Sequence, residues 1–183
     1  ELDIPMRRTG SYVVAIGEGE LATLEELFRQ GLENGVPGLR LIRRSEMLTR
    51  EPLINPAVAG ALFAPTAGVV DPFQAVIAAA ENAVNNGVTV MLNCAFEGFE
   101  RKEGRISAVK TSRGTFPCRF AVNCARAGAA QVLNAALPGS TAQLQLRRGE
   151  YLIYDQSEIL LNNVLFPTPS EKGKGIIVST TTH

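Results

Sequence analysis

A helix with well-defined ends, followed directly by an apolar stretch, most constrains how this chain can fold. Asp71 is a typical N-cap residue, Pro72 suits the first helical position, and Gly87 supplies a C-terminal stop. Apolar residues recur on one face of this predicted helix, at Phe73, Val76, Ile77, Ala80 and Val84. Residues 88–92 then form an apolar run that predicts a short buried strand. A helix followed at once by such a strand is half of a doubly wound α/β unit.

Strand-like and helix-like segments also alternate in the rest of the chain. Before Asp71 the patterns predict strands at 11–17, 38–42 and 59–64, a helix at 18–34, and a brief helix that Ser45 caps and that ends before Pro52. After residue 92 they predict a hairpin at 95–111 with a turn at 102–104, strands at 114–117 and 119–124, a helix at 127–136, and β elements at 143–155, 163–166 and 175–181. We therefore expect an α+β fold, with a mixed, mostly antiparallel sheet that carries helices on one face, next to an incomplete α/β lobe.

The composition excludes several classes of protein. Lys and Arg total 18, as do Asp and Glu, so no charge excess points to nucleic acid or to an anionic membrane surface. No apolar run approaches the roughly 18 residues that a transmembrane segment needs. The three cysteines form no C-x-x-C pair, and their odd number fits a protein of the reducing cytoplasm. His183 is the only histidine, which argues against a Ser-His-Asp triad or a His-rich metal site, so no metal is expected.

Four stretches, spread over nearly the whole chain, carry a resemblance to a known family. They are Leu48–Leu53, Gly68–Pro72, Arg147–Tyr151, and Phe166–Pro169 with Gly173–Gly175 and Thr182–His183. In this order they resemble the FAD-dependent D-amino-acid-oxidase/glycerol-3-phosphate-dehydrogenase superfamily, and most of all the anaerobic glycerol-3-phosphate dehydrogenase A-subunit group. The resemblance implies FAD as cofactor and oxidation of glycerol 3-phosphate or a small 2-hydroxy acid by hydride transfer to the flavin.

The resemblance also implies a domain organisation. Residues 1–68 and 140–183 correspond to segments of a substrate domain, and residues 69–139 to a partial FAD-binding lobe. The G-x-G-x-x-G turn of relatives is absent, since Gly17-Glu18-Gly19 lacks the third glycine, and the chain stops directly after a strand-like stretch. We therefore expect an internal fragment of a larger flavoprotein, inactive without its missing N- and C-terminal segments. Its exposed sheet edge is expected to pair with another copy or to be covered by a rearranged segment.

Three residues are implied to contact the cofactor. The main chain near Phe96 corresponds to an adenine contact, although an ordinary hairpin with Phe96 in the core is the alternative. Asn123-Cys124-Ala125-Arg126 stands where relatives carry N-A-A-G, so Ala125 and Arg126 correspond to the pyrophosphate contact. An arginine in place of the glycine either obstructs the cofactor or pairs with its phosphate.

Other residues are implied to form the substrate site. Arg148 and Tyr151 correspond to groups that bind a small anionic substrate, and the alternative for them is a solvated strand start. Lys172 and Lys174 correspond to an anion-attracting lip, or else to a solvated turn. His183 is the candidate catalytic base, while Glu51 is expected to be structural.

A different class of function also fits the sequence. The missing phosphate-binding turn and Arg126 favour a non-catalytic interaction or scaffold remnant that binds no flavin. The colour of the purified protein separates the two hypotheses, because a flavoprotein is yellow and a remnant that takes up no FAD is colourless.

Overall fold

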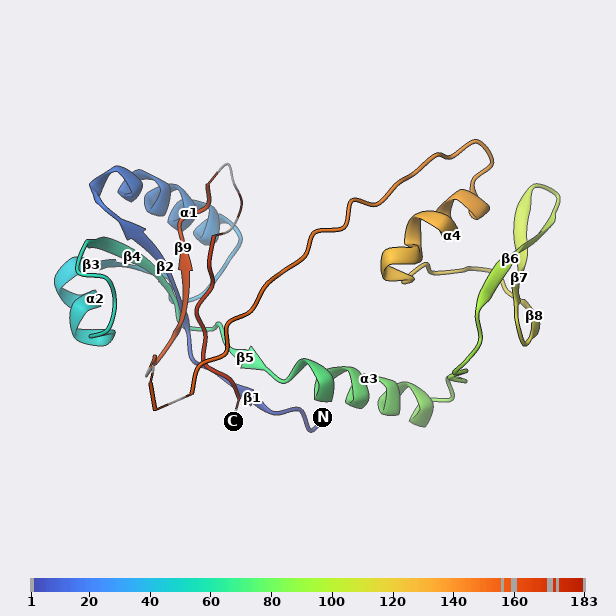
Figure 1. Ribbon diagram of the computed structural model, residues 1–183, viewed down its shortest axis with the longest axis horizontal. Coiled ribbons are helices and arrows are strands. Elements are labelled where there is room, and N and C mark those ends of the chain that lie inside the picture. The colour runs from blue at the N-terminus through green and yellow to red at the C-terminus, as the bar shows by residue number, and fades with distance from the viewer. Residues whose placement is uncertain (1, 156, 159–160, 171–172, 174, 183) are drawn as a thin grey trace. The chain divides into compact units, whose positions relative to one another are not determined.

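The computed structural model describes residues 2–155, 157–158, 161–170, 173 and 175–182 (Figure 1). The chain forms two compact units, residues 1–88 together with 153–183, and residues 89–152. The first unit is therefore discontinuous in sequence. The FAD-binding lobe expected at residues 69–139 stays a prediction, because contacts within one chain do not define a cofactor-binding domain.

A four-stranded sheet forms the centre of the first unit (Figure 1). Its order is β3 (Arg40–Arg43), β4 (Val58–Ala64), β2 (Ser11–Ile16) and β9 (Val164–Pro167). The β3–β4 and β4–β2 pairs are antiparallel, whereas β9 runs parallel to β2 with Ser11 opposite Val164. The predicted α+β class with a mixed, mostly antiparallel sheet is confirmed, and the strand near the C-terminus lies directly beside the strand near the N-terminus.

The two faces of this sheet pack against different helices, so the expectation that helices cover only one face is wrong for this sheet. Val13 and Ala15 of β2 face the 13-residue helix α1 (Leu21–Glu33), which follows the short 3₁₀ turn η1 (Glu18–Glu20) and buries Leu24. Tyr12 and Val14, which point to the opposite face, contact Met47 of α2 (Arg44–Arg50). Helix α2 therefore lies on the face of the sheet opposite to α1, and each helix has its own cluster of buried apolar residues.

Helix α3 (Pro72–Asn85) begins as the sequence predicts. The Asp71 carboxylate accepts hydrogen bonds from the N–H groups of Phe73 at 2.9 Å and Gln74 at 3.0 Å. Just before the helix, β5 (Val69–Val70) pairs antiparallel with β1 (Met6–Arg7). The apolar face of α3 is exposed, however, and Phe73 keeps 79% of its surface accessible.

The second unit contains a three-stranded antiparallel sheet and a helix. The strands are β6 (Phe96–Lys102), β7 (Arg105–Thr111) and β8 (Gly114–Pro117). Glu103 and Gly104 both have positive φ, as a two-residue hairpin turn requires, so the predicted hairpin is confirmed. Helix α4 (Ala129–Ala136) follows the 3₁₀ turn η2 (Arg126–Gly128), and Arg101 of β6 donates a hydrogen bond to the Ala136 carbonyl.

Several predicted strands do not form. The described residues of 88–92, 119–124 and 143–155 belong to no strand, and residues 175–181 contribute only an isolated antiparallel bridge between Val178 and Leu165. An extended apolar segment becomes a strand only where a neighbour takes its N–H and C=O groups, and residues 88–92, 119–124 and 143–155 form no strand pairing with a described neighbour. The predicted cap at Ser45 is also wrong, because α2 already begins at Arg44 and Arg43 occupies the N-cap position.

Candidate functional site

The side chain of Asn123 organises the loop that precedes α4. Its amide oxygen accepts a hydrogen bond from the Ala125 N–H at 3.2 Å, and its amide nitrogen donates to the Ala129 carbonyl at 2.9 Å. The Ala125 carbonyl accepts from the Gly128 N–H at 2.9 Å. These three bonds fix the course of residues 123–129, while the side chains of Ala125 and Arg126 stay exposed.

Arg126 has a backbone conformation that favours glycine. Its φ is +50°, in the left-handed region that L-residues other than Asn and Asp adopt rarely. Arg126 is also the first residue of η2, so its N–H group and that of Ala127 point out of a helix start and have no acceptor within the helix. The backbone at residue 126 therefore has a conformation that favours glycine, but the residue there is an arginine.

Phe96 lies at the start of β6 and is half-buried. Its ring centroid is 4.9 Å from that of Phe99, with the two rings tilted by 58°. The neighbouring Ala95 uses both of its main-chain groups locally, because its N–H donates to the Ser112 hydroxyl and its carbonyl accepts from the Ser112 N–H, each at 2.9 Å. A contact from the Ala95 main chain to a ligand would thus depend on the second lone pair of its carbonyl oxygen.

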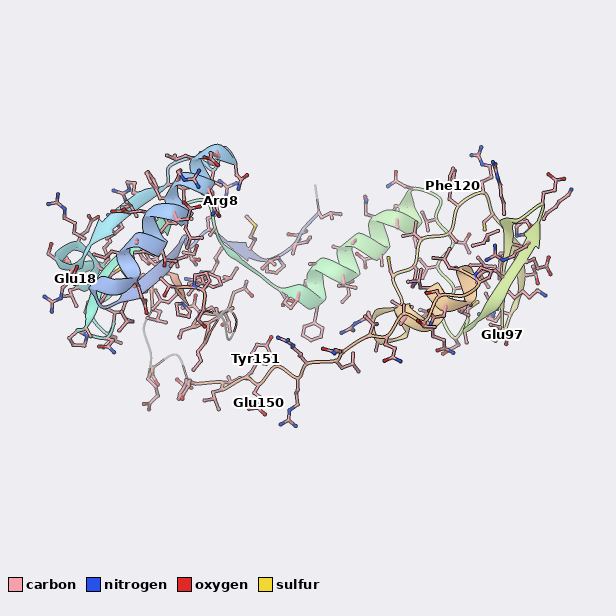
Figure 2. The ribbon with its side chains drawn as sticks, turned by 90° about the horizontal axis from the view of Figure 1, so that it is seen from above. Arg8, Glu18, Glu97, Phe120, Glu150 and Tyr151 are labelled. Carbon is pink, nitrogen blue, oxygen red and sulfur yellow. The ribbon has the colours of Figure 1, made fainter. Side chains whose placement is uncertain are left out.

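Arg148 and Tyr151 lie on an extended segment of the second unit. Figure 2 labels Tyr151 and its neighbour Glu150 on this segment. The Arg148 guanidinium donates to a carboxylate oxygen of Glu150 at 2.6 Å, and both side chains are largely exposed. Tyr151 keeps 91% of its surface accessible. The two predicted substrate residues therefore lie on the same exposed segment, and the Arg148 guanidinium is already paired with the Glu150 carboxylate.

The other predicted substrate and catalytic residues lie outside the described residues. These are Lys172, Lys174 and His183. The described residues beside them form tight contacts, since Ser170 and Gly173 exchange two backbone hydrogen bonds of 3.1 and 2.9 Å. Gly175 has a φ of +69°, and a Cβ there would lie 2.3 Å from the Pro167 ring, so this position requires glycine.

The carboxylates of Glu20, which sequence reasoning did not single out, and of Glu51, which it expects to be structural, hold the segment around β9. The Glu20 carboxylate accepts from the Thr168 hydroxyl at 2.6 Å, and Glu51 accepts from the Asn162 N–H at 3.3 Å. The sequence separations of 148 and 111 residues explain why no local pattern indicates these contacts. Glu20 also places a carboxylate at the start of α1, in the Gly17–Glu20 turn that lacks the third glycine.

Glu51 and Tyr12 are both fully buried. Burial raises the pKa of Glu51, and the N–H groups of Asn162 and Asn163 partly offset that rise. Burial also raises the pKa of Tyr12, although the Arg50 guanidinium lies near enough to oppose it. The Tyr12 hydroxyl nevertheless makes no hydrogen bond of good geometry to a described residue.

Two kinds of feature are missing from the part of the chain that the structure describes. It contains no group of three or more His, Cys, Asp or Glu side chains that could hold a metal ion. Nor does any of its helices combine the length and the apolar character that crossing a membrane requires.

Comparison with known proteins identifies the family. The sequence profile of the "FAD dependent oxidoreductase" family, DAO, matches residues 1–183. The chain belongs to this FAD-dependent oxidoreductase family. The family resemblance inferred from the four sequence stretches is therefore confirmed, and FAD is the cofactor of the family.

Three known proteins are similar to the chain over most of its length. The glycerol 3-phosphate dehydrogenase of Caloramator mitchellensis is 36% identical, and the match covers 100% of this chain and 38% of that protein. The mitochondrial L-2-hydroxyglutarate dehydrogenase of Mus musculus is 27% identical, over 92% of this chain and 39% of that protein. The FAD-bound L-α-glycerophosphate oxidase of Mycoplasma pneumoniae superimposes with a TM-score of 0.83 at 26% identity, over 98% of this chain and 48% of the other. The chain thus spans less than half the length of these relatives.

Proposed function

We propose that this chain is part of an FAD-dependent dehydrogenase that oxidises glycerol 3-phosphate or a small 2-hydroxy acid. The observation that carries the proposal is the 36% identity to the Caloramator mitchellensis glycerol 3-phosphate dehydrogenase, which extends over the whole chain. The similarity to a mitochondrial L-2-hydroxyglutarate dehydrogenase keeps 2-hydroxy acids in the proposal. Because those relatives are longer, the remaining parts of the site would come from segments outside these 183 residues.

The loop at residues 123–128 fits an FAD pyrophosphate. The left-handed backbone at Arg126 and the N–H groups of Arg126 and Ala127, which have no acceptor within η2, support this assignment, and the Arg126 guanidinium adds a positive charge. We therefore assign Ala125 and Arg126 to the phosphates, and the main chain next to Phe96 to the adenine. FAD, when bound, supplies the acceptor for the hydride that leaves the alcohol carbon.

The residues of this chain would bind the anionic end of the substrate and remove a proton. Arg148 would exchange its Glu150 partner for a phosphate or carboxylate of the substrate, and Tyr151 would donate a hydrogen bond to the same group. Lys172 and Lys174 would raise the local concentration of anions. His183 would accept the hydroxyl proton as the alcohol becomes a ketone.

A substrate panel tests this proposal. The full-length FAD-loaded protein is assayed with an artificial electron acceptor and glycerol 3-phosphate, L-2-hydroxyglutarate or uncharged glycerol. We expect oxidation of one of the two anions and none of glycerol. Arg148→Ala should raise KM by about tenfold or more, since a charge-assisted hydrogen bond contributes about 1.5–3 kcal/mol. Arg147→Ala is the matched control and should leave KM nearly unchanged, and equal effects of both variants would remove Arg148 from the site.

Arg126 also favours a second candidate, an interaction or scaffold module that binds no flavin. The guanidinium then blocks the loop at residues 123–128 instead of pairing with phosphate. Titration of added FAD into the wild-type protein and into Arg126→Gly decides between the two. Uptake by the wild type supports the dehydrogenase, whereas uptake only after the substitution supports the module. Association of two copies through a sheet edge stays a prediction, and light scattering of the purified protein tests it.

A further inference from the structure

A buried carboxylate joins the start of the β9 segment to the end of α2. Among the described residues, Glu51 is the one charged side chain that is fully buried. One of its oxygens accepts from the Asn162 N–H at 3.3 Å, and the other has no partner among the described residues. The Asn162 side-chain amide donates to the Arg50 carbonyl at 3.0 Å, so Asn162 contacts the end of α2 through two groups.

The surroundings of Glu51 contain few charges to compensate it. Tyr12 of β2 lies near enough for Glu51 to affect its pKa, and α2 contributes Arg50 and Glu46, which pair with each other at 2.8 Å. The segment that contains Asn162 and Asn163 contributes only neutral amides. A buried carboxylate with one unpartnered oxygen and no cation of its own favours its neutral, protonated form.

The attachment at Glu51 lies where the β9 segment begins. Directly after it, the Val164 N–H donates to the Gly10 carbonyl at 3.3 Å, and the Leu165 N–H donates to the Val178 carbonyl at 2.8 Å. The Asn163 amide also donates to the Thr9 carbonyl. A change in the contacts of Glu51 therefore acts on the first residues of a strand that leads to Lys172, Lys174 and His183.

We infer that Glu51 is a positioning residue whose protonation tightens the attachment of the β9 segment to the sheet and whose ionisation loosens it. The inference rests on the proposed function only for the roles of Lys172, Lys174 and His183, which follow β9 in the sequence. Burial supports it through its effect on the Glu51 pKa, which rises above the ordinary value of 4.5. A raised pKa in the folded state means that the stabilisation is complete below the unfolded-state pKa and is lost as the pH rises through the folded-state pKa.

Amide hydrogen exchange tests the inference without flavin or substrate. Exchange of the Val164 and Leu165 N–H groups is followed by NMR on the full chain between about pH 5 and pH 8 and corrected for the intrinsic exchange rate. In the wild type we expect their protection to fall as the pH rises, by about tenfold for each pKa unit by which Glu51 is raised. Tyr12 stays neutral and Arg50 stays charged over this range, because the pKa of each side chain is raised above an ordinary value that already lies well above pH 8.

Two substitutions separate Glu51 from its neighbours. Glu51→Gln keeps an acceptor for the Asn162 N–H but cannot ionise. In this variant the protection of the Val164 and Leu165 N–H groups should be high and independent of pH. Glu46→Gln is the matched control and should keep the wild-type pH dependence. The inference is overturned if the wild type shows no pH dependence, or if Glu51→Gln shows the same dependence as the wild type. Failure of the proposed function would appear only in the substrate assay and would leave this exchange result unchanged.

Discussion

The Thr168 hydroxyl donates a 2.6 Å hydrogen bond to the Glu20 carboxylate. The same carboxylate oxygen accepts the Ile16 N–H at 2.9 Å, so it joins the end of β2, the start of α1 and the residue that follows β9. The Thr168 N–H also donates to the Val14 carbonyl at 3.2 Å. Thr168 is thus held to the sheet through both its main chain and its side chain.

Thr168→Val should therefore destabilise the first unit. Valine keeps the shape of threonine but leaves the half-buried Glu20 carboxylate without one of its two donors. We expect the free energy of unfolding in urea to fall by about 1.5–3 kcal/mol, as for other hydrogen bonds to charged groups. Thr180→Val is a matched control, because the buried Thr180 hydroxyl has no partner among the described residues and its loss should cost little. Equal losses in the two variants would contradict the assigned role of the Glu20 contact.

Asp71 should stabilise α3 as an N-cap. Asp71→Ala removes the acceptor for the N–H groups of Phe73 and Gln74 and should cost about 1 kcal/mol of stability. Asp71→Asn keeps an acceptor and should cost much less. Thermal unfolding followed by circular dichroism measures both, and an Asn variant as unstable as the Ala variant would argue against capping by this side chain.

Arg126→Gly should relieve backbone strain in the loop before α4. A residue with a Cβ at φ +50° carries a left-handed conformation that glycine adopts freely, so the substitution should raise the free energy of unfolding by up to about 1 kcal/mol. Arg119→Gly, in the neighbouring exposed segment without a positive φ, should slightly lower stability instead. A loss of stability in both variants would show that Arg126 makes a contact that outweighs its strain.

The sequence predicts local structure well and long-range pairing poorly. The Asp71 cap and the Glu103–Gly104 hairpin depend on neighbours within a few residues, and both form as expected. The apolar run at 88–92 indicates a capacity to be buried, but nothing in it specifies a partner, and it forms no strand. For the candidate site, the unusual residue at Arg126 is visible in the sequence, whereas the contacts of Glu20 and Glu51 depend on how β9 pairs with β2.

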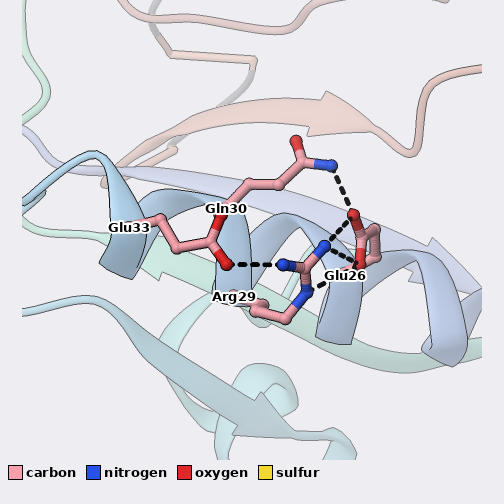
Figure 3. Close-up of polar contacts among 4 residues, drawn as sticks. All are labelled: Glu26, Arg29, Gln30 and Glu33. Carbon is pink, nitrogen blue, oxygen red and sulfur yellow. Dashed lines mark hydrogen bonds and ion pairs between the residues drawn. The ribbon is translucent and has the colours of Figure 1, made fainter.

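The exposed face of α1 gives a prediction for pH dependence. Arg29 donates to Glu26 at 2.7 Å and to Glu33 at 2.5 Å, and Gln30 donates to Glu26 (Figure 3). The hydrogen bond from Arg29, followed by that from Gln30, holds the pKa of Glu26 below its ordinary value of 4.5. The resulting small stabilisation is present above that value and is lost as the pH falls through the lowered pKa.

NMR titration of the Glu26 carboxyl measures this effect. Arg29→Ala should return its pKa toward the ordinary value, and Arg29→Lys should retain part of the shift. Added salt should also reduce the shift, because the ion pair is exposed. A Glu26 pKa that does not respond to Arg29→Ala would contradict the assigned cause.

Anaerobic reduction of bound FAD tests most directly whether these residues belong to a dehydrogenase for small anionic hydroxy compounds. The full-length protein is loaded with FAD, and its visible absorbance is followed after addition of glycerol 3-phosphate or L-2-hydroxyglutarate without any other electron acceptor. The proposal predicts rapid loss of the oxidised flavin spectrum with one of these substrates, and much slower loss in His183→Ala. Stable flavin absorbance with both substrates, or a protein that takes up no FAD at all, would contradict it.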